Sequence, residues 1–260
     1  DRADDADLAG LVRAVADVDG LRWVRMFYLY PETLTEGLID LLAEHDKVLP
    51  YVDMPLQHAS DAMLRRMRRG HGGDRLRRVV ERLRERVEPL VFRTAFIVGH
   101  PGETDGDFAE LLAFVRWAEF DRVGAFRYSN EEGTASGEME AQVEPAQIAA
   151  RHGELMATQR PISRAKLEAM VGSEIEVLVE GESDESELLL QGRFWGQAPE
   201  IDGQVFLANG DARPGELRRA FVTGAADYDL IADLCDRDGH RPDPPPGTGP
   251  RPRKIRLPTI

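Results

Sequence analysis

Apolar positions in the first half of the chain follow two alternating spacings, which predict strands and amphipathic helices in turn. Short apolar runs predict four strands, at 22–28, 48–56, 91–98 and 122–128. Apolar residues three and four positions apart predict helices at 8–18, 34–42, 61–69, 74–87 and 104–118. Asp74 is predicted to cap the fourth of these. Strands that alternate with helices form a parallel sheet with right-handed crossovers, so we expect an α/β fold, either an incomplete βα barrel or an open sheet.

The spacing of apolar residues changes after about residue 165. Short apolar runs separated by Gly, Pro and Asp turns predict five strands, at 173–180, 188–194, 204–208, 217–223 and 227–232. Five short strands in so short a segment are typical of a small antiparallel barrel of the OB type. The second half is therefore predicted to be all-β.

These patterns divide the chain into four parts. They are an α/β domain at 1–144, a linker helix at 145–165, a β-barrel at 166–233 and a tail at 234–260. Pro145 stands where a helix can begin. The tail holds seven of the sixteen prolines, a composition that predicts disorder.

Composition narrows the choice of function. The single cysteine, Cys235, can form neither an intrachain disulfide nor a multi-thiolate metal site. No apolar run approaches the ~20 residues of a membrane span, so we expect a cytoplasmic protein without a membrane partner. The net charge of −14 is uneven, since residues 163–232 carry 6 Lys and Arg against 14 Asp and Glu. An acidic barrel disfavours a phosphate backbone and favours a basic protein partner.

The third predicted strand leads into a turn from Gly99 to Gly102. Thr104, with Asp107 three residues later, gives the next helix a capping-box pattern. Ligands bind to βα folds at the C-terminal ends of the strands. We expect the glycines to let the backbone approach a ligand without an intervening Cβ, although such a turn could also be purely structural.

Polar residues follow all four predicted strands, whose C-terminal ends meet at one edge of a parallel sheet. They are Tyr28 and Tyr30, Gln57 and His58, His100 and Glu103, and Arg127, Tyr128 and Ser129. Gln57 and His58 could instead cap the next helix, and Glu103 could stabilise a helix N-terminus. No nucleophile–base pair and no metal-ligand spacing is recognisable. The residues alone predict a ligand-binding βα domain with an acidic barrel, and no specific reaction.

Several segments resemble the radical-SAM methylthiotransferases. They are 28–31, 51–61, 93–104, 126–129 and 131–134. The barrel resembles the TRAM domain of that family, through 198–203 and 228–230. The resemblance covers about residues 8–233 and is nearest to the branch that modifies an aspartate of ribosomal protein S twelve.

This resemblance implies the C-terminal part of a partial (βα)6 radical-SAM barrel, followed by a TRAM domain that helps to recognise the substrate. It implies S-adenosylmethionine and two four-iron four-sulfur clusters as cofactors. One cluster and S-adenosylmethionine would generate a radical that abstracts a hydrogen from the β-carbon of the target aspartate. The second cluster would take part in delivering the methylthio group.

The chain departs from the family pattern in its cysteines. All six cluster ligands are absent, so we expect no metal ligand and no catalytic residue here, and no activity from this chain alone. The four predicted strands resemble the third to sixth of the family barrel, which places the cluster-binding regions upstream. His100 stands where the family usually has Phe.

The resemblance also implies site residues. Those for the cofactor are Gln57, Arg93, Ile97, Val98 and Gly99, the last three through backbone near the adenine. Gln57 and Arg93 would face the cofactor or the substrate at the barrel mouth. His58 and Arg127 would bind substrate in the same cavity.

Three functions remain open at this point. The first is a ribosomal-protein methylthiotransferase, whose partner would be basic ribosomal protein S twelve or the small ribosomal subunit. The second is a tRNA methylthiotransferase, and the third is a non-catalytic binding module. The dipeptide Gln57-His58 and segment 28–31 favour the first, as does an acidic barrel that should repel RNA.

Overall fold

The structure is a computed structural model that describes residues 7–236 and 238–240. Two compact units divide between Ile162 and Ser163, inside the long helix α6 (Pro145–Glu168). The tail that the sequence predicts to be disordered lies outside the described residues from 241 onward.

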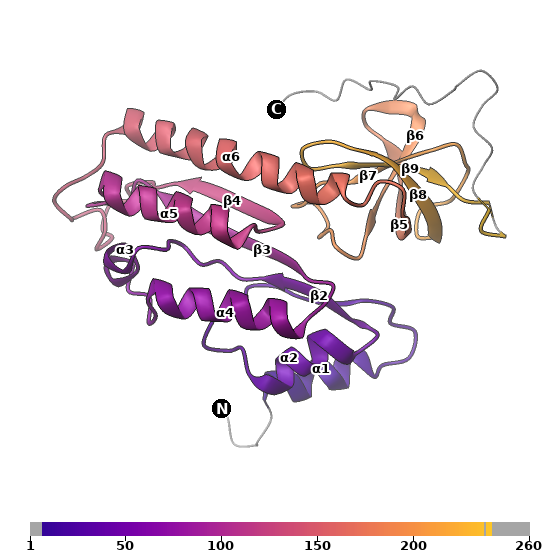
Figure 1. Cartoon of the computed structure of the whole chain (residues 1–260), viewed down its shortest axis with the longest axis horizontal. Coiled ribbons are helices and arrows are strands. Elements are labelled where there is room, and N and C mark those ends of the chain that lie inside the picture. Colours follow the sequence, from indigo (N-terminus) through magenta and orange to yellow (C-terminus); the bar gives the residue numbers. More distant parts are fainter. Residues whose placement is uncertain (1–6, 237, 241–260) are drawn as a thin grey trace. The chain divides into compact units, whose positions relative to one another are not determined.

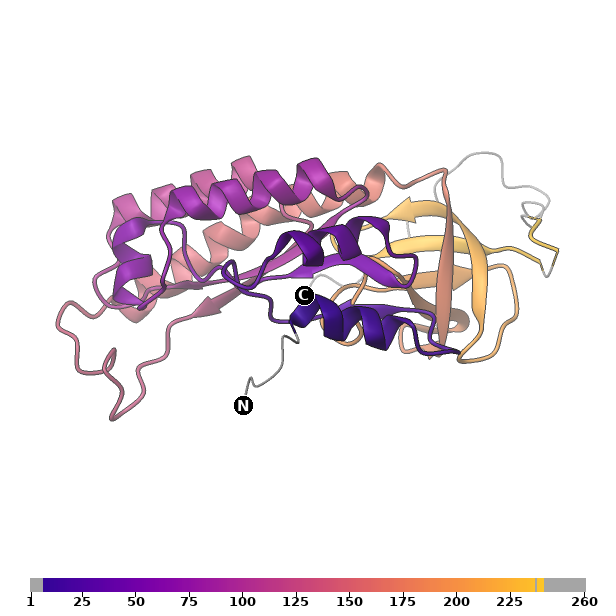
Figure 2. The same cartoon turned by 90° about the horizontal axis from the view of Figure 1, so that it is seen from below.

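The first unit is built on a four-stranded parallel sheet in the order β1-β2-β3-β4 (Figure 1). Its elements before α6 are α1 (Leu8–Ala16), β1 (Val24–Met26), α2 (Glu36–Glu44), β2 (Val48–Asp53), α3 (Asp61–Arg66), α4 (Gly73–Arg86), β3 (Val91–Val98), α5 (Asp105–Ala118) and β4 (Arg122–Arg127). Sequential parallel strands with right-handed crossovers place their connecting helices on one side, and Figure 2 shows α4, α5 and α6 in one layer there. The predicted α/β fold class is confirmed.

Alternation along β3 gives the two faces of the sheet different roles. Phe92, Phe96 and Val98 are buried in the core under the helices. Phe96 meets Phe114 of α5 edge-on, with ring centroids 6.4 Å apart. Burying each such side chain contributes roughly 1.5–3 kcal/mol. Arg93, Ala95 and Ile97 point to the opposite face, where Phe126 of β4, in register with Ile97, is 56% exposed.

Two strands end earlier than the sequence predicts, because tertiary pairing rather than apolar character sets their length. β1 covers only three residues, and β2 stops at Asp53. Pro55 lacks an N–H, so a regular ladder cannot continue through it. The chain still follows β3, since Met54 N–H donates to Arg93 O at 3.0 Å and Gln57 forms an isolated bridge with Phe96.

The two capping predictions have different outcomes. Thr104 and Asp107 form the predicted capping box, with Asp107 N–H donating to Thr104 Oγ1 at 3.2 Å and Thr104 N–H to Asp107 Oδ2 at 3.0 Å. The prediction that Asp74 caps α4 is wrong, because it lies in the first turn and the N-cap residue makes no side-chain hydrogen bond. Asp61 of α3 instead accepts Gly73 N–H at 2.7 Å, a contact between helices that local spacing does not reveal.

The second unit is a closed five-stranded barrel with the strand order β5-β6-β7-β9-β8. Its strands are β5 (Glu174–Ser183), β6 (Ser186–Phe194), β7 (Val205–Ala208), β8 (Leu217–Ala225) and β9 (Leu230–Leu234). The predicted small barrel is confirmed, with one difference: β7 and β9 pair in parallel, whereas the sequence pattern suggested antiparallel pairing throughout.

Apolar side chains fill the barrel from several strands. Val177, Val222 and Leu230 are fully buried there, and Leu167 near the end of α6 packs into the same core. Cys235, just beyond β9, is buried and free, and burial raises the pKa of its thiol. The thiol is therefore inert, as expected of a cysteine in apolar surroundings. Within residues 7–236 and 238–240, no helix is long and apolar enough to cross a membrane.

Candidate functional site

The candidate site lies where β2 and β3 end, and Gln57 forms its centre. Gln57 N–H donates to Ala95 O and Ile97 N–H donates to Gln57 O, both at 2.9 Å. Gln57 holds a φ of +71°, a strained conformation for a residue with a side chain. Two of the predicted residues, Gln57 and Ile97, are thus direct neighbours.

Arg93 lies on the same sheet face as Ile97, because the two are separated by an even number of residues along β3. It is not level with Gln57, however. Arg93 is in register with Asp53. It precedes Ile97 by four positions, so the two residues are about 13 Å apart along the strand. The structure therefore places Arg93 and Ile97 on one face but at two depths, whereas the Val98 side chain lies in the core on the helix side.

Asp53 is a site residue that the sequence reasoning missed. Its side chain is buried, and Oδ1 accepts from Arg93 Nη1 at 2.5 Å. Oδ2 accepts from Tyr28 N–H at 3.1 Å and so holds Tyr28 at a φ of +56°. One carboxylate thus orients the Arg93 guanidinium and the chain after β1. The sequence feature that could have indicated Asp53 is that it is the one acidic residue in the apolar strand at 48–56.

His58 lies on the helix side, away from Arg93 and Ile97. It is fully buried, and its Nδ1 accepts Ser60 N–H at 3.0 Å. Ser60 Oγ in turn donates to the Asp107 carboxylate at the start of α5. Burial lowers the pKa of His58 to about 4, so the ring is neutral at pH 7. This geometry supports the structural alternative, in which His58 stabilises the start of α3.

Arg127 is also separated from the other predicted residues. It is exposed and pairs in register with Val98, whose side chain lies in the helix-side core. Alternation places Arg127 on the opposite face from Phe126. The structure therefore does not bring His58 and Arg127 into one cavity with Gln57 and Arg93.

The turn after β3 is closed by protein side chains. Gly99 has a φ of +81°, and a Cβ built on it would lie 2.9 Å from Ile148 Cδ1 of α6. Gly102 has a φ of +80°, and its Cβ would lie 2.8 Å from the Arg66 guanidinium. The expectation that these glycines leave room for a ligand is therefore not supported on this side. Packing by Ile148 and Arg66 accounts for both.

Glu103 holds this turn from inside. Its carboxylate accepts Gly99 N–H and forms an ion pair with Arg151 of α6 at 3.2 Å. Arg151 also donates to Glu103 O at 3.1 Å and to Asp105 Oδ1 at 2.7 Å. Burial raises the pKa of Glu103, opposed by the Gly99 hydrogen bond and by Arg151. Arg151 is the second residue that the sequence reasoning missed, because it lies almost fifty positions away.

His100 occupies the turn in the manner of an aromatic residue. It is buried, and its ring meets that of Tyr128 at 5.3 Å between centroids. Burial lowers the pKa of the imidazole, which favours the neutral ring. The histidine thus fills the position by packing rather than by charge.

The chain does not supply a cluster site. Its single cysteine, Cys235, lies buried at the end of the barrel, and three thiolates are needed to hold a cluster with one open iron. The surface beside Gln57 and Ile97 has groups of the kind that would suit an adenosyl group. The Gln57 side chain makes no hydrogen bond to any residue between 7 and 240 that the structure describes, and Ile97 and Phe126 offer apolar surface.

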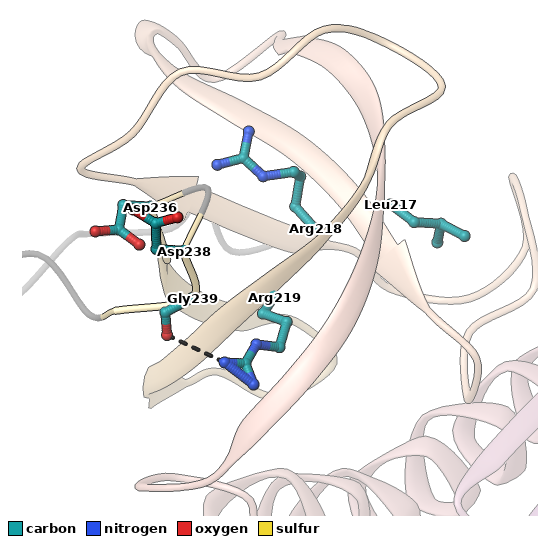
Figure 3. Close-up of a pocket in the computed structure, with 6 residues that line it drawn as sticks. All are labelled: Leu217, Arg218, Arg219, Asp236, Asp238 and Gly239. Atoms are coloured by element: carbon teal, nitrogen blue, oxygen red, sulfur yellow. Dashed lines mark hydrogen bonds between the residues drawn. The ribbon is translucent and has the colours of Figure 1, made fainter.

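A separate pocket of about 220 Å³ lies in the second unit (Figure 3). It is lined by Leu217, Arg218, Arg219, Asp236, Asp238 and Gly239. Both arginines are already engaged, Arg218 with Cys235 O at 2.8 Å and Arg219 with Gly239 O at 3.3 Å. This pocket contains none of the predicted site residues.

The two units match two different protein-family models. Residues 1–115 match the Radical SAM superfamily, and residues 171–235 match the TRAM domain. A protein of Sorangium cellulosum named "Ribosomal protein uS12 methylthiotransferase RimO" is 66% identical over 89% of this chain and 47% of its own length. The chain belongs to the radical-SAM methylthiotransferase family. A protein of the same name from Anaeromyxobacter sp. (strain K) is 46% identical over 94% of this chain and 54% of its own length.

The chain spans about half the length of these curated methylthiotransferases. A solved radical SAM enzyme, coproporphyrinogen III oxidase (HemN) from Escherichia coli, is similar at 20% identity with a TM-score of 0.46, over 60% of this chain and 36% of that one. S-adenosylmethionine and four-iron four-sulfur clusters are the cofactors of this methylthiotransferase family, and the cysteines that ligate the clusters are absent from this chain.

Replacing Gly99 by Ala tests the packing explanation of the turn. We expect Gly99→Ala to lower the free energy of unfolding by about 2–4 kcal/mol, from a positive φ and from overpacking against Ile148. Gly133→Ala is the matched control, since Gly133 has a φ of +76° and nothing within 4 Å of a Cβ. In urea denaturation, the control should lose only about 1 kcal/mol of the free energy of unfolding, the cost of a positive φ for alanine. Equal losses would contradict the packing explanation.

Burial of neutral His58 predicts a pH-dependent stability. Its folded pKa lies below the unfolded value, so the unfolded chain binds more protons and stability falls as the pH drops from 6.5 to 4. The loss should be roughly 3 kcal/mol. Urea denaturation across this range should show a flatter dependence for His58→Gln than for the wild type. An unchanged slope in His58→Gln would refute a buried neutral ring.

Proposed function

We propose that this chain is the cofactor-facing and substrate-recognising part of a methylthiotransferase that modifies an aspartate of ribosomal protein uS12 in the cytoplasm. The observation that carries the proposal is 66% identity over 89% of the chain to a uS12 methylthiotransferase. A match over 89% of the chain covers most of both units.

The sheet face opposite the helices is the proposed cofactor surface. Backbone at Ile97, Val98 and Gly99 is fixed by Gln57 on one side and by Glu103 on the other, so a bound adenine would meet a rigid edge. The Gln57 amide is available to donate or accept a hydrogen bond. When bound, S-adenosylmethionine supplies the radical chemistry for which the family is named.

Arg93 is the proposed electrostatic contact on this face. Asp53 orients the guanidinium in a partly buried place and offsets part of its charge, so the proposed contact acts chiefly through directed hydrogen bonds. A carboxylate of the cofactor or of the target aspartate would be attracted to it, and a fork-shaped donor suits that group. His58 supports the neighbouring loop, and Arg127 remains a proposed contact for the substrate on the exposed side.

The TRAM barrel is the proposed site of substrate recognition. Its excess of 14 acids over 6 bases creates a field that attracts a basic ribosomal protein and repels free RNA. No cluster step is assigned to this chain, because its one cysteine cannot hold a cluster.

A chimera tests the proposal. The matching segment of the Sorangium cellulosum relative is replaced by this chain, and the products are analysed by mass spectrometry of uS12 and of tRNA. We expect a methylthio group on uS12 and none on tRNA. Modification of tRNA alone would reverse the assignment of substrate.

The same chimera tests the site residues. Gln57→Ala and Arg93→Gln should each lower uS12 modification by about tenfold or more, the effect expected when a contact worth about 1.4 kcal/mol is lost. Arg116→Gln, at an exposed position late in α5, is the control and should leave the rate unchanged. Unaltered rates of uS12 modification in both site variants would contradict the proposal that Gln57 and Arg93 contact the cofactor.

A further inference from the structure

A dense group of arginines lies on α3 and the start of α4. Residues 65–78 contain seven arginines and no lysine, with Asp74 as their only acid. This segment is strongly positive in a chain whose net charge is −14. Like charges placed this close repel one another and cost stability, so their presence needs a reason.

The arginines later in α4 have structural partners. Arg82 and Arg86 form ion pairs with Glu36, and Arg86 also pairs with Asp40 at 2.6 Å. Arg84 donates to a main-chain carbonyl at the end of α5. Arg77 lies over the Trp117 ring at 4.6 Å. These residues belong to the packing of the fold.

The remaining six arginines differ from these. They are Arg65, Arg66, Arg68, Arg69, Arg75 and Arg78, here called the arginine surface. Within residues 7–236 and 238–240, none of the six forms an ion pair with a carboxylate; Arg65 only donates to a carbonyl of its own helix at 3.1 Å. All are exposed except Arg69, which is half-buried. Their charges are therefore available to a partner.

The fold gathers the arginine surface at the edge of the sheet that carries the candidate site. α3 follows β2 directly and lies beside the first turns of α4 and α5 (Figure 1), where Asp61 holds Gly73 and Ser60 holds Asp107. The Arg66 guanidinium lies against Gly102 in the turn after β3. The arginine surface thus borders the turn that leads to the cofactor face.

The composition of this surface selects one kind of partner. Arginine presents a planar fork of donors that binds phosphate in two places at once. A membrane-binding helix would also expose large apolar side chains, and the described residues of α3 and α4 expose none. Six charges spread over two elements fit an extended polyanion better than a single phosphate group.

We propose that the arginine surface binds the phosphate backbone of RNA, and thereby holds the enzyme on the RNA that surrounds its protein substrate. The identity of that RNA rests on the proposed function, because a ribosomal protein is embedded in ribosomal RNA. The acidic barrel and the arginine surface then have separate tasks: one recognises a basic protein and the other its polyanionic surroundings.

Fluorescence anisotropy of a labelled single-stranded 20-nucleotide RNA, titrated with the full chain between 50 and 200 mM KCl, tests this surface. Each phosphate contact contributes about −0.7 to the slope of log K against log salt. Arg75→Gln/Arg78→Gln should reduce the slope by about 1.4 and weaken binding severalfold. Arg65→Gln/Arg68→Gln should act in the same way.

The matched control is Arg82→Gln/Arg86→Gln, which removes the same charge from the same helix at residues that have carboxylate partners. We expect it to leave the slope unchanged. Equal losses in both α4 variants would overturn the proposal in favour of unspecific charge. Equally tight binding of polyglutamate, or of vesicles that contain anionic lipid, would assign the arginines to another kind of partner.

The assay needs neither cofactor nor uS12, so it separates the two proposals. RNA binding that depends on the arginine surface, in a chimera that fails to modify uS12, would leave the surface standing and reject the proposed substrate. Normal modification of uS12 without RNA binding would reject the surface alone.

Discussion

The buried carboxylate of Glu103 is the contact on which the site depends. It accepts Gly99 N–H, and it is neutralised by Arg151, which reaches it from α6. A buried ion pair adds little net stability, but removal of one partner leaves a charge in an apolar place and costs about 3–5 kcal/mol. The turn after β3 therefore has one stable arrangement as long as α6 is in place.

Helix α6 also stabilises this turn through side-chain packing. Ile148 occupies the space that a side chain at Gly99 would need, and Gln159 donates to Phe120 O at 2.7 Å further along the helix. The same helix then carries Leu167 into the core of the barrel. One continuous element thus supports the backbone of the proposed cofactor surface in the first unit and contributes Leu167 to the barrel core in the second.

Local patterns in the sequence predict most of the elements and part of the site. The strand at 91–98, the capping box of Thr104 and Asp107 and the five strands of the barrel follow from apolar spacing and turn residues, which act over a few positions. The Asp61 contact with Gly73 and the Asp53 pair with Arg93 join separate elements, so no local spacing reports them. The positive φ of Gln57, which bridges to β3, is also set by tertiary pairing, and a sequence pattern does not give that angle.

The glycine at position 99 shows the limit of the motif most clearly. A glycine in a βα turn suggested room for a ligand, but the room is taken by Ile148 from a helix almost fifty residues later. The sequence correctly indicated that position 99 requires a glycine, but the reason is the packing of Ile148 rather than space for a ligand. Packing against a distant helix depends on the tertiary structure and cannot be predicted from the sequence of the turn itself.

The two sheets of the molecule differ in how they can meet other chains. The barrel is closed, so every strand has two neighbours and a partner can recognise it only through side chains. In the described part of the first unit, β1 and β4 each pair with one neighbouring strand, and His152 of α6 accounts for one main-chain group of β4, at Ala125 O. This sheet can therefore accept another strand through main-chain hydrogen bonds, by β-augmentation.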